Sequence, residues 1–251
     1  MAAQRRARSA ETVANLIRAD IETGRLREGD KLPSIRQLMA LHGIGRGAAQ
    51  AAMSTLLAEG LIVARHGSGY HVQRFSRIRR VTPDRIVEAH QDPSRAIQDH
   101  DTGGRPRQVH VVVGEVEPPE VVADAFESMR PVVYRRRVFS VEDRPVQLAI
   151  SYYPLDVARG TRIEDPNPGP GGVLGRLREL GLEPDRYEER VIARAPRPDE
   201  ITALGMRRGG AVVLEITRLA WAAARCVEVT RMVLDAAAYE LVHRFEIPSN
   251  P

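Results

Sequence analysis

Two polar side chains four residues apart, Arg46 and Gln50, lie in the otherwise bare stretch HGIGRGAAQAAM, residues 42–53. On a helix, residues at this spacing lie on one face. An arginine pairs best with O6 and N7 of guanine, and a glutamine pairs best with N6 and N7 of adenine. The chemistry that these two side chains could do is therefore the recognition of base edges in a DNA major groove.

Three helices and a β-hairpin are expected to position this pair. Apolar residues recur at helical spacing over residues 13–21, and a second helix is predicted to begin at a capping-box pattern of Ser34 and Gln37. A third helix carries an apolar stripe over residues 49–57. Two short β runs then surround a Gly-rich tip at residues 66–69. This order predicts a winged helix-turn-helix.

The segment GDKLPSIRQLMALHGIGRGAAQAAMSTLLAEGLIVARHGSGYHV resembles the DNA-binding domain of the GntR family of bacterial transcription regulators. The shared features are a Leu-Pro-Ser start, a Gly-Leu-Ile helix exit and a Gly-containing wing, and the match covers about residues 9–73. The DNA-contacting positions implied by this resemblance are Ser34, Arg36, Arg46, Gly47, Gln50, His66 and Gly67.

Several departures from the family pattern reduce the expected contacts. Gly45 stands where the family usually has Ser, Gly47 and Ala48 replace two Thr residues, and Gln50 replaces a common Arg. Hydroxyl contacts to phosphate and one guanine-type contact are lost, although the small residues would allow the backbone to approach the groove closely. Two base contacts give about 2–6 kcal/mol of discrimination, whereas specific binding needs about 4–10 kcal/mol. A homodimer on a palindromic DNA site is therefore expected.

Charge is unevenly distributed along the 251 residues. Residues 1–80 carry 14 Lys or Arg against 6 Asp or Glu, a net charge of +8, and the remaining residues carry a net charge of −4. We therefore expect only the N-terminal part to meet a polyanion.

Composition argues against several other classes of protein. The single cysteine, Cys226, excludes an internal disulfide framework and a Cys-rich zinc site, and it fits a reducing cytoplasm. No apolar run approaches the about 18–20 residues of a membrane span, and the charged N-terminus lacks the apolar stretch of a secretory signal. The seven histidines are scattered, and neither a catalytic triad nor a phosphate-loop motif is present. We expect a cytoplasmic protein that is not an enzyme and holds no metal or cofactor.

The rest of the chain predicts a connector and a second domain. Residues 74–106 are interpreted as a charged connector with a short helix near residues 84–90. Beyond it, β runs alternate with short helices, which predicts an antiparallel sheet with a few helices against one face, an α+β domain. The expected organisation is a winged helix-turn-helix in residues 1–73, the connector, and an α+β domain in residues 107–251.

This second part resembles the UTRA ligand-binding domain, which has a chorismate-lyase-like fold. The resemblance lies in YRRRVFSVEDRPVQLAISYYP, ARAPRPDEITALGM and VLEITRLAWAAARCVEVTRMVL. It implies a small-molecule effector, often anionic, in a cleft of the sheet, where Arg side chains meet its charged groups and a strand Glu accepts hydrogen bonds. The positions that match are Arg137, Arg194, Arg218 and Glu228.

Two details of this expected pocket stay open. The second arginine of the family's Arg-x-Arg strand falls on Phe139, or else Arg135 and Arg137 are the pair. In addition, Gly171 and Gly172 open a predicted helix, and their backbone N–H groups could hold an anion.

The combined resemblance implies a ligand-responsive regulator that binds DNA, a repressor released from a palindromic operator by its effector. Two alternatives remain: a lyase-like activity retained in the second domain, or a DNA-binding protein without effector control. Substrate turnover would identify the first, and DNA affinity that is insensitive to ligands would identify the second.

Overall fold

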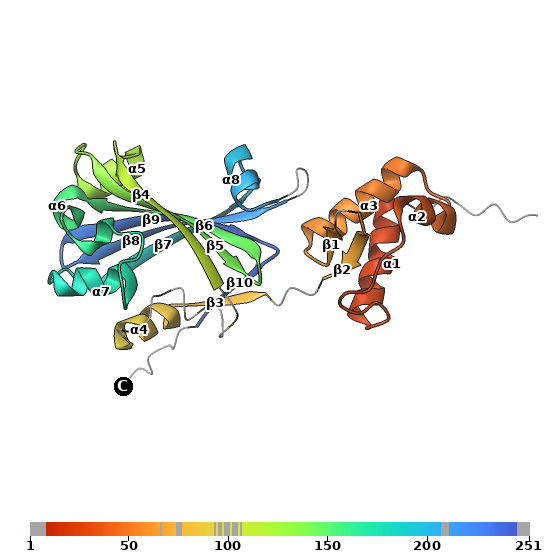
Figure 1. Cartoon of the computed structure of the whole chain (residues 1–251), viewed down its shortest axis with the longest axis horizontal. Helices are drawn as coiled ribbons and strands as arrows, with labels where there is room; N and C mark the ends of the chain where they lie inside the picture. Colours follow the sequence, from red (N-terminus) through yellow and green to blue (C-terminus); the bar gives the residue numbers. More distant parts are fainter. Residues whose placement is uncertain are drawn as a thin grey trace, which may run out of the picture. The chain divides into compact units, whose positions relative to one another are not determined.

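The computed structural model describes residues 9–65, 67–73, 77–92, 94, 97, 101, 105, 107–206 and 211–244. Its α+β fold divides into two compact units, drawn in Figure 1. Met1–Arg77 forms most of the first unit, and Ile78–Met206 with Val212–Pro251 forms the second.

The first unit has the predicted order of a winged helix-turn-helix. Its elements are α1 (Ala10–Glu22), α2 (Ile35–His42), α3 (Arg46–Ala58), β1 (Ile62–Arg65) and β2 (Gly69–Val72). The capping box at the start of α2 is confirmed, because the Gln37 backbone N–H donates to the Ser34 hydroxyl at 3.3 Å and the Ser34 N–H donates to Oε1 of Gln37 at 2.8 Å. Gly45 is the N-cap of α3, with extended backbone angles and no side-chain cap.

One apolar core joins the three helices of this unit. Val13, Ile17 and Ile21 of α1 pack with buried residues of α2 and α3. Leu16 was expected on the same face but is 40% exposed, and Ala14 is buried instead. The guanidinium of Arg18 donates to Glu59 at 2.9 Å, which ties α1 to the end of α3.

The wing is the antiparallel pair β1–β2, and it is fastened to the loop before α2. The ring of His71 lies 3.2 Å from the carbonyl oxygen of Gly29 through Nδ1 and 2.8 Å from the hydroxyl of Ser68 through Nε2. Leu32 N–H also donates to the carbonyl of Tyr70 at 2.8 Å. The wing therefore forms one body with the entry to α2.

The second unit is built on a six-stranded antiparallel sheet with the order β4-β5-β6-β9-β8-β7. Its strands are β4 (Arg107–Val116), β5 (Val132–Val141), β6 (Arg144–Pro154), β7 (Arg186–Arg194), β8 (Val213–Ala222) and β9 (Arg225–Asp235). β5 and β6 are joined by a tight turn in which Glu142 and Asp143 take left-handed conformations.

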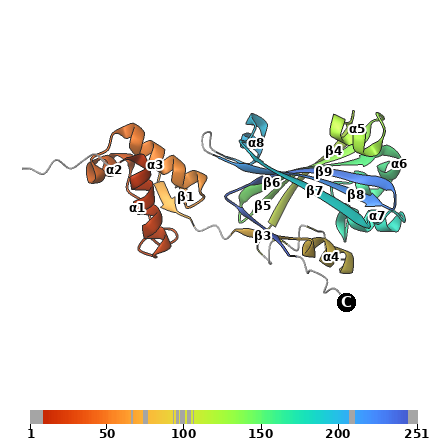
Figure 2. The same ribbon diagram turned by 180° about the vertical axis from the view of Figure 1, so that it is seen from behind.

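Helices cover both faces of this sheet, whereas the sequence predicted one covered face. The helices and the 3₁₀ turn are α5 (Glu120–Phe126), α6 (Leu155–Ala158), η2 (Arg162–Glu164), α7 (Gly172–Glu179) and α8 (Pro198–Ala203). Val122 of α5 packs against Val132, whereas Leu177 of α7 packs against Val133, the next residue of the same strand. Neighbouring strand residues point to opposite faces, so α5 and α7 lie on opposite sides of the sheet, as Figures 1 and 2 show.

The interpretation of residues 74–106 as a connector needs correction. Ile78–Thr82 forms β3, which pairs in parallel with β10 (Tyr239–His243) as a second small sheet. The predicted short helix is confirmed as α4 (Asp84–Gln91). Arg80 and Arg85 are buried in ion pairs with Glu189 and Asp101. The local pattern could not reveal this strand because its partner lies near the other end of the chain.

Within these described residues, no helix is both long enough and apolar enough to cross a membrane. The same residues contain no group of His, Cys, Asp and Glu side chains placed to hold a metal ion.

Candidate DNA-reading surface and effector pocket

The outward face of α3 presents the predicted base-reading pair. Arg46, Gly47 and Gln50 are all exposed. The opposite stripe of the helix, Ala49, Ala52, Met53 and Leu56, is fully buried in the core. This division fixes the rotation of the helix, so the polar side chains must point to solvent.

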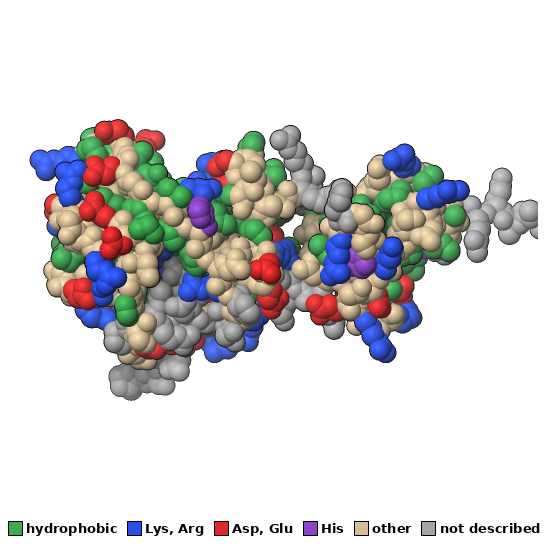
Figure 3. Space-filling model, viewed as in Figure 1, with side chains coloured by type: hydrophobic (Ala, Val, Ile, Leu, Met, Phe, Trp, Pro, Cys, Tyr) green, Lys and Arg blue, Asp and Glu red, His purple; other side chains and the backbone are tan. Residues whose placement is uncertain are grey.

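Unpaired positive charge marks this surface. Among the residues that the structure describes, neither Arg36 nor Arg46 has a carboxylate partner, whereas Arg18 and Arg25 are paired with Glu59 and Asp20. Figure 3 shows Lys and Arg side chains at several places on this unit, on the right of the view. A cation without an internal partner can meet a phosphate or a base without first breaking an ion pair.

Ser34, Gly47 and Gly67 lie at exposed backbone positions, as the expected contacts require. A Cβ atom added to Gly47 would meet nothing within 4 Å, so its surface is open. The Ser34 hydroxyl already donates to Oε1 of Gln37 at 2.9 Å, so a phosphate contact would compete with the cap. His66 lies outside the described residues.

A pocket of about 370 Å³ opens on the face of the sheet that α7 covers. It brings together five of the six predicted effector-binding residues: Arg137, Gly171, Gly172, Arg218 and Glu228. They come from β5, the start of α7, β8 and β9, so the fold assembles the pocket from distant parts of the chain.

Glu228 is the hydrogen-bond acceptor at the centre of this pocket. Its Oε1 accepts from the hydroxyls of Ser151 at 3.0 Å, Tyr153 at 2.9 Å and Thr230 at 2.8 Å. Burial by itself opposes ionisation of Glu228, but Arg218, then Arg137 and the hydroxyl donors, outweigh it and lower the pKa of the carboxyl. The group is therefore a carboxylate at neutral pH.

Three arginines that line the pocket, Arg135, Arg137 and Arg218, keep buried N–H groups without partners among the described residues. Arg137 donates to the Ser151 hydroxyl through Nη2, while its Nε has no acceptor among the described residues. Arg218 lies 3.4 Å from Glu228 through Nη2, and its Nε and Nη1 likewise lack acceptors within that part of the chain. Buried donors of this kind cost free energy unless a ligand satisfies them.

Arg135 lines the pocket as well, but most of its guanidinium is bound to backbone. Its guanidinium donates to the backbone carbonyls of Ile163, Asp165 and Pro166, the last at 3.0 Å. It therefore holds the loop at residues 163–166, which borders the pocket at Pro166, while its Nε, like that of Arg137, has no acceptor among the described residues. Phe139, on the same face, lies beneath Arg137, 5.7 Å from the guanidinium carbon to the ring centre.

The expected anion contacts from Gly171 and Gly172 need correction. The Gly171 N–H donates to the carbonyl of Ser94 at 3.2 Å, and the Gly172 N–H donates to the carbonyl of Gly169 at 3.1 Å. Both groups are thus already satisfied by the backbone. These glycines line the pocket and shape its wall, but their N–H groups do not point to an anion site.

Arg194 is not in the pocket. It lies opposite Val213 on the face that α8 covers, and its guanidinium donates to Glu200 at 2.7 Å and to Glu215 at 2.6 Å. Burial raises the pKa of Glu200 by itself, but Arg194 and the Arg197 N–H outweigh burial and lower it to about 2. Arg194 therefore forms structural ion pairs, and the alternation of side chains along β7 places it on the face of the sheet opposite the pocket.

Comparison with known proteins fits this pairing of units. The model of bacterial regulatory proteins of the gntR family matches residues 9–72, and the UTRA domain model matches residues 101–240. An uncharacterised HTH-type transcriptional regulator of Streptomyces coelicolor is 30% identical over 80% of this chain and 79% of its own length. The chain belongs to the GntR family, and its second unit is a UTRA domain.

Further relatives of this GntR regulator agree. An HTH-type transcriptional regulator of Mycobacterium tuberculosis is 26% identical over 80% of this chain and 72% of its own length. A solved structure of a GntR-family transcriptional regulator, 25% identical, covers 95% of this chain and 98% of its own with a TM-score of 0.59. PhnF from Mycobacterium smegmatis, 18% identical with a TM-score of 0.57, covers 94% of this chain and 99% of its own and shares the fold. The two HTH-type relatives and the first solved structure are transcriptional regulators, not enzymes.

Sequence reasoning missed several residues of the UTRA pocket. Tyr153 and Tyr187 line it together with Arg135, and Ser151 and Thr230 supply the hydroxyl donors to Glu228. Alternation along the strands could have found most of them, because Ser151 and Tyr153 share a face, as do Glu228 and Thr230. The hydroxyl of Tyr187 is buried without a partner among the described residues, so it is a further group that a ligand could satisfy.

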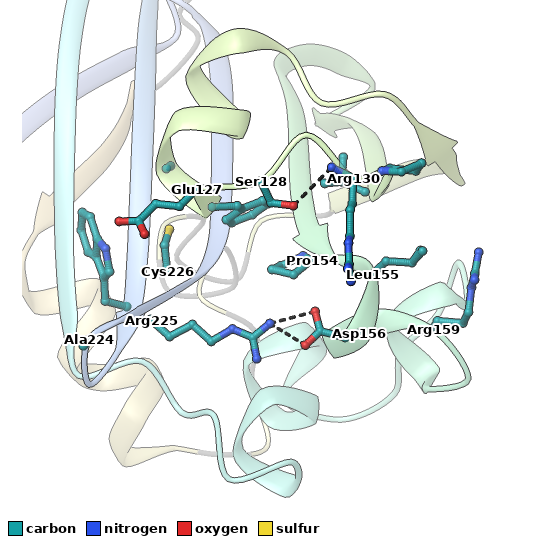
Figure 4. Close-up of a pocket in the computed structure, with 15 residues that line it drawn as sticks. Glu127, Ser128, Arg130, Pro154, Leu155, Asp156, Arg159, Ala224, Arg225 and Cys226 are labelled. Atoms are coloured by element: carbon teal, nitrogen blue, oxygen red, sulfur yellow. Dashed lines mark hydrogen bonds and ion pairs between the residues drawn. The ribbon is translucent and has the colours of Figure 1, made fainter.

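A second, larger hollow of about 870 Å³ lies between α5, α6 and the β8–β9 turn of the UTRA domain (Figure 4). Phe126, Leu155 and Trp221 line it together with Cys226, whose thiol is buried and has its pKa raised to about 11 by that burial. Arg225 faces Asp156 across the hollow at 2.6 Å. Arg225 and Asp156 satisfy each other, whereas the smaller pocket has buried N–H groups without acceptors among the described residues, so the smaller pocket is the better candidate for the effector.

Proposed function

We propose that this chain is a homodimeric repressor in the cytoplasm that leaves a palindromic operator when a small anionic effector fills the UTRA pocket. The observation that carries the proposal is the set of buried N–H groups on Arg137 and Arg218, beside the carboxylate of Glu228, that have no acceptor among the described residues. GntR regulators bind DNA and UTRA domains bind small-molecule effectors, so one chain joins the two activities.

On the DNA side, Arg46 and Gln50 read bases, with guanine and adenine as their preferred partners. Arg36, Ser34 and the wing residues, Gly67 and His66 among them, contact the phosphate backbone. Gly47, which has no side chain, allows the helix to approach the groove wall closely. Two base contacts in one copy are marginal, and a second copy on a palindrome raises the discrimination to about 4–12 kcal/mol.

On the effector side, the chemistry of the pocket defines the ligand. Arg137 and Arg218 suit a carboxylate or phosphate group, because a guanidinium can donate two parallel hydrogen bonds to either. Glu228 suits a hydroxyl or amino group of the same ligand, which would share or replace the donors that it now holds. A volume of about 370 Å³ fits a small metabolite rather than a polymer.

The division of labour follows the sequence expectation, with one change. Residues 1–73 read DNA, and residues 107–251 bind the effector and dimerise. The segment between them belongs partly to the second unit, through β3 and α4. In the dimer, two α3 helices enter successive major grooves about 34 Å apart, and the effector changes the spacing of the two winged units.

Gel-shift titration on the DNA that flanks the protein's own gene tests this function. Salt concentration is varied, and small phosphorylated and carboxylated metabolites are added in turn. Specific retardation that one metabolite relieves is the expected result. Retardation that does not distinguish this DNA from random sequence, and that no metabolite relieves, would contradict the proposal.

A further inference from the structure

A line of alternating buried charges runs from the effector pocket to strand β3. Within the pocket, Glu228 faces Arg218 at 3.4 Å. On the next strand, Glu189 lies directly opposite Arg218 in the β7–β8 register, so both side chains are on the same face. Glu189 in turn accepts a hydrogen bond from Arg80 of β3. The order along this line is carboxylate, guanidinium, carboxylate, guanidinium.

All four groups are shielded from water. The side chains of Arg80 and Arg218 are 1% and 3% exposed, and those of Glu189 and Glu228 are each 10% exposed. Charges in such surroundings interact over longer distances than on a surface, because water does not screen them. A change in charge at Glu228 therefore changes the electrostatic energy of Arg80.

Glu189 lies between two arginines: Arg80 donates a hydrogen bond to it, and Arg218, opposite it in the β7–β8 register, interacts with it through charge. Burial, and then Arg85, lower the pKa of Arg80 to about 10, and Arg218 acts in the same direction. Glu189 favours the charged form of both arginines. An anion bound beside Arg218 would neutralise the charge of that guanidinium and weaken its attraction to Glu189.

We propose that Glu189 couples the effector pocket to β3, the first element after the DNA-binding unit in the chain. An anion in the pocket attracts Arg218 and weakens the interaction of Arg218 with Glu189. Glu189 then binds Arg80 more strongly, and β3 is held more firmly to the domain. This inference rests on the proposed function, since it assumes that the effector is an anion held by Arg218, and it names the contact that transmits its binding.

Hydrogen–deuterium exchange of the full-length protein tests the coupling, with inorganic phosphate as the anion. In the wild type, phosphate is expected to slow exchange of the β3 amides about threefold or more, whereas in Glu189→Gln it should leave them unchanged. Glu240→Gln is the matched control, because Glu240 of β10 forms an exposed ion pair with Arg79, the neighbour of Arg80 on β3. It should keep the phosphate response. Equal responses in wild type and Glu189→Gln would overturn the proposal.

A double-mutant cycle without ligand tests the coupling independently of whether the pocket binds an anion. Glu228→Gln removes the pocket carboxylate, so Arg218 turns to Glu189 and β3 exchange should become faster in the wild-type background. In the Glu189→Gln background the same change should have no effect on β3, and additive effects would overturn the coupling. Calorimetry that detects no phosphate binding to the wild type would count against the anionic pocket, and the cycle would still decide the coupling.

Discussion

Tyr153 donates a hydrogen bond of 2.9 Å from its hydroxyl to Oε1 of Glu228, in the interior of the UTRA domain. Burial, reinforced by the charge of Glu228, raises the pKa of the Tyr153 phenol, so it remains a donor at neutral pH. The carboxylate is thereby kept oriented with Oε2 toward Arg218. The pocket is thus arranged before any ligand enters.

Removing this donor tests how much the arrangement contributes. Tyr153→Phe is expected to lower the free energy of unfolding by about 1.5–3 kcal/mol, because a hydrogen bond to a buried charge is lost. Urea unfolding followed by circular dichroism measures it. Tyr152→Phe is the control, since the neighbouring ring lies on the opposite face of the sheet, and it should cost much less. Equal losses would mean that the Tyr153 hydroxyl contributes nothing specific.

Arg46→Ala tests the recognition helix. The variant should lose about 1–3 kcal/mol of operator discrimination for each copy in the dimer, while phosphate affinity of the UTRA pocket stays the same. Fluorescence anisotropy with operator and random DNA measures the discrimination. Arg25→Ala, which removes an exposed arginine already paired with Asp20, serves as the control. Unchanged discrimination in Arg46→Ala would remove α3 from its assigned role.

Gly47 offers a test of close backbone approach. Alanine is a better helix former than glycine by up to about 1 kcal/mol, and a Cβ here meets nothing in the protein, so Gly47→Ala should stabilise the first unit slightly. If the helix backbone lies against the groove wall, the same methyl group should weaken operator binding. Thermal unfolding and anisotropy measure the two effects. Stabilisation with full operator affinity would show that the glycine is not needed for approach.

Arg137→Ala tests the effector pocket. Loss of the Arg137 guanidinium, which has an unsatisfied N–H among the described residues, should weaken binding of an anion by tenfold or more, since charge-assisted hydrogen bonds contribute about 1.5–3 kcal/mol each. Isothermal calorimetry with phosphate, and later with the metabolite found by gel shift, measures the change. Arg225→Ala, in the larger hollow, should bind as the wild type does. A loss confined to Arg225→Ala would move the effector site to that hollow.

The ion-pair cluster of Arg194, Glu200, Glu215 and Arg231 predicts a pH dependence. The pKa of Glu200 is lowered from 4.5 to about 2 in the folded protein, so its carboxylate stabilises the fold fully above about pH 4.5. That contribution should disappear as the pH falls toward 2. Unfolding free energies measured against pH should therefore show a gap between wild type and Glu200→Gln that narrows over this range. A gap that stays constant would mean that Glu200 is not ionised in the fold.

Local signals in the sequence predicted the first unit almost completely. The capping box at Ser34, the glycine before Arg46 and the apolar stripe of α3 each depend on residues only a few positions apart. The exception is Leu16, which shares the helical spacing of its neighbours but is exposed, because the rotation of α1 against α3 decides which residues are buried. Periodicity gives the apolar face of a helix only to within one residue.

The second unit was predictable in its order of elements but less so in its contacts. The strands, the β5–β6 turn and α7 follow from local patterns. Two features needed the fold: the pairing of β3 with β10 and the side of the sheet on which Arg194 lies. Both depend on partners far away in the sequence. The fold also distinguishes Arg135 from Arg137, because only Arg135 donates hydrogen bonds to the loop at residues 163–166.

The sparse outward face of α3 also affects the entropy of DNA binding. Between Gly45 and Ser54, only Arg46 and Gln50 among the exposed residues carry long side chains, and the others are Gly, Ala and Ser. Freezing a long side chain at an interface costs about 0.5–1.5 kcal/mol, and most positions on this helix have no rotamers to freeze. Base recognition by α3, as proposed, would therefore make few contacts but would also lose little side-chain entropy.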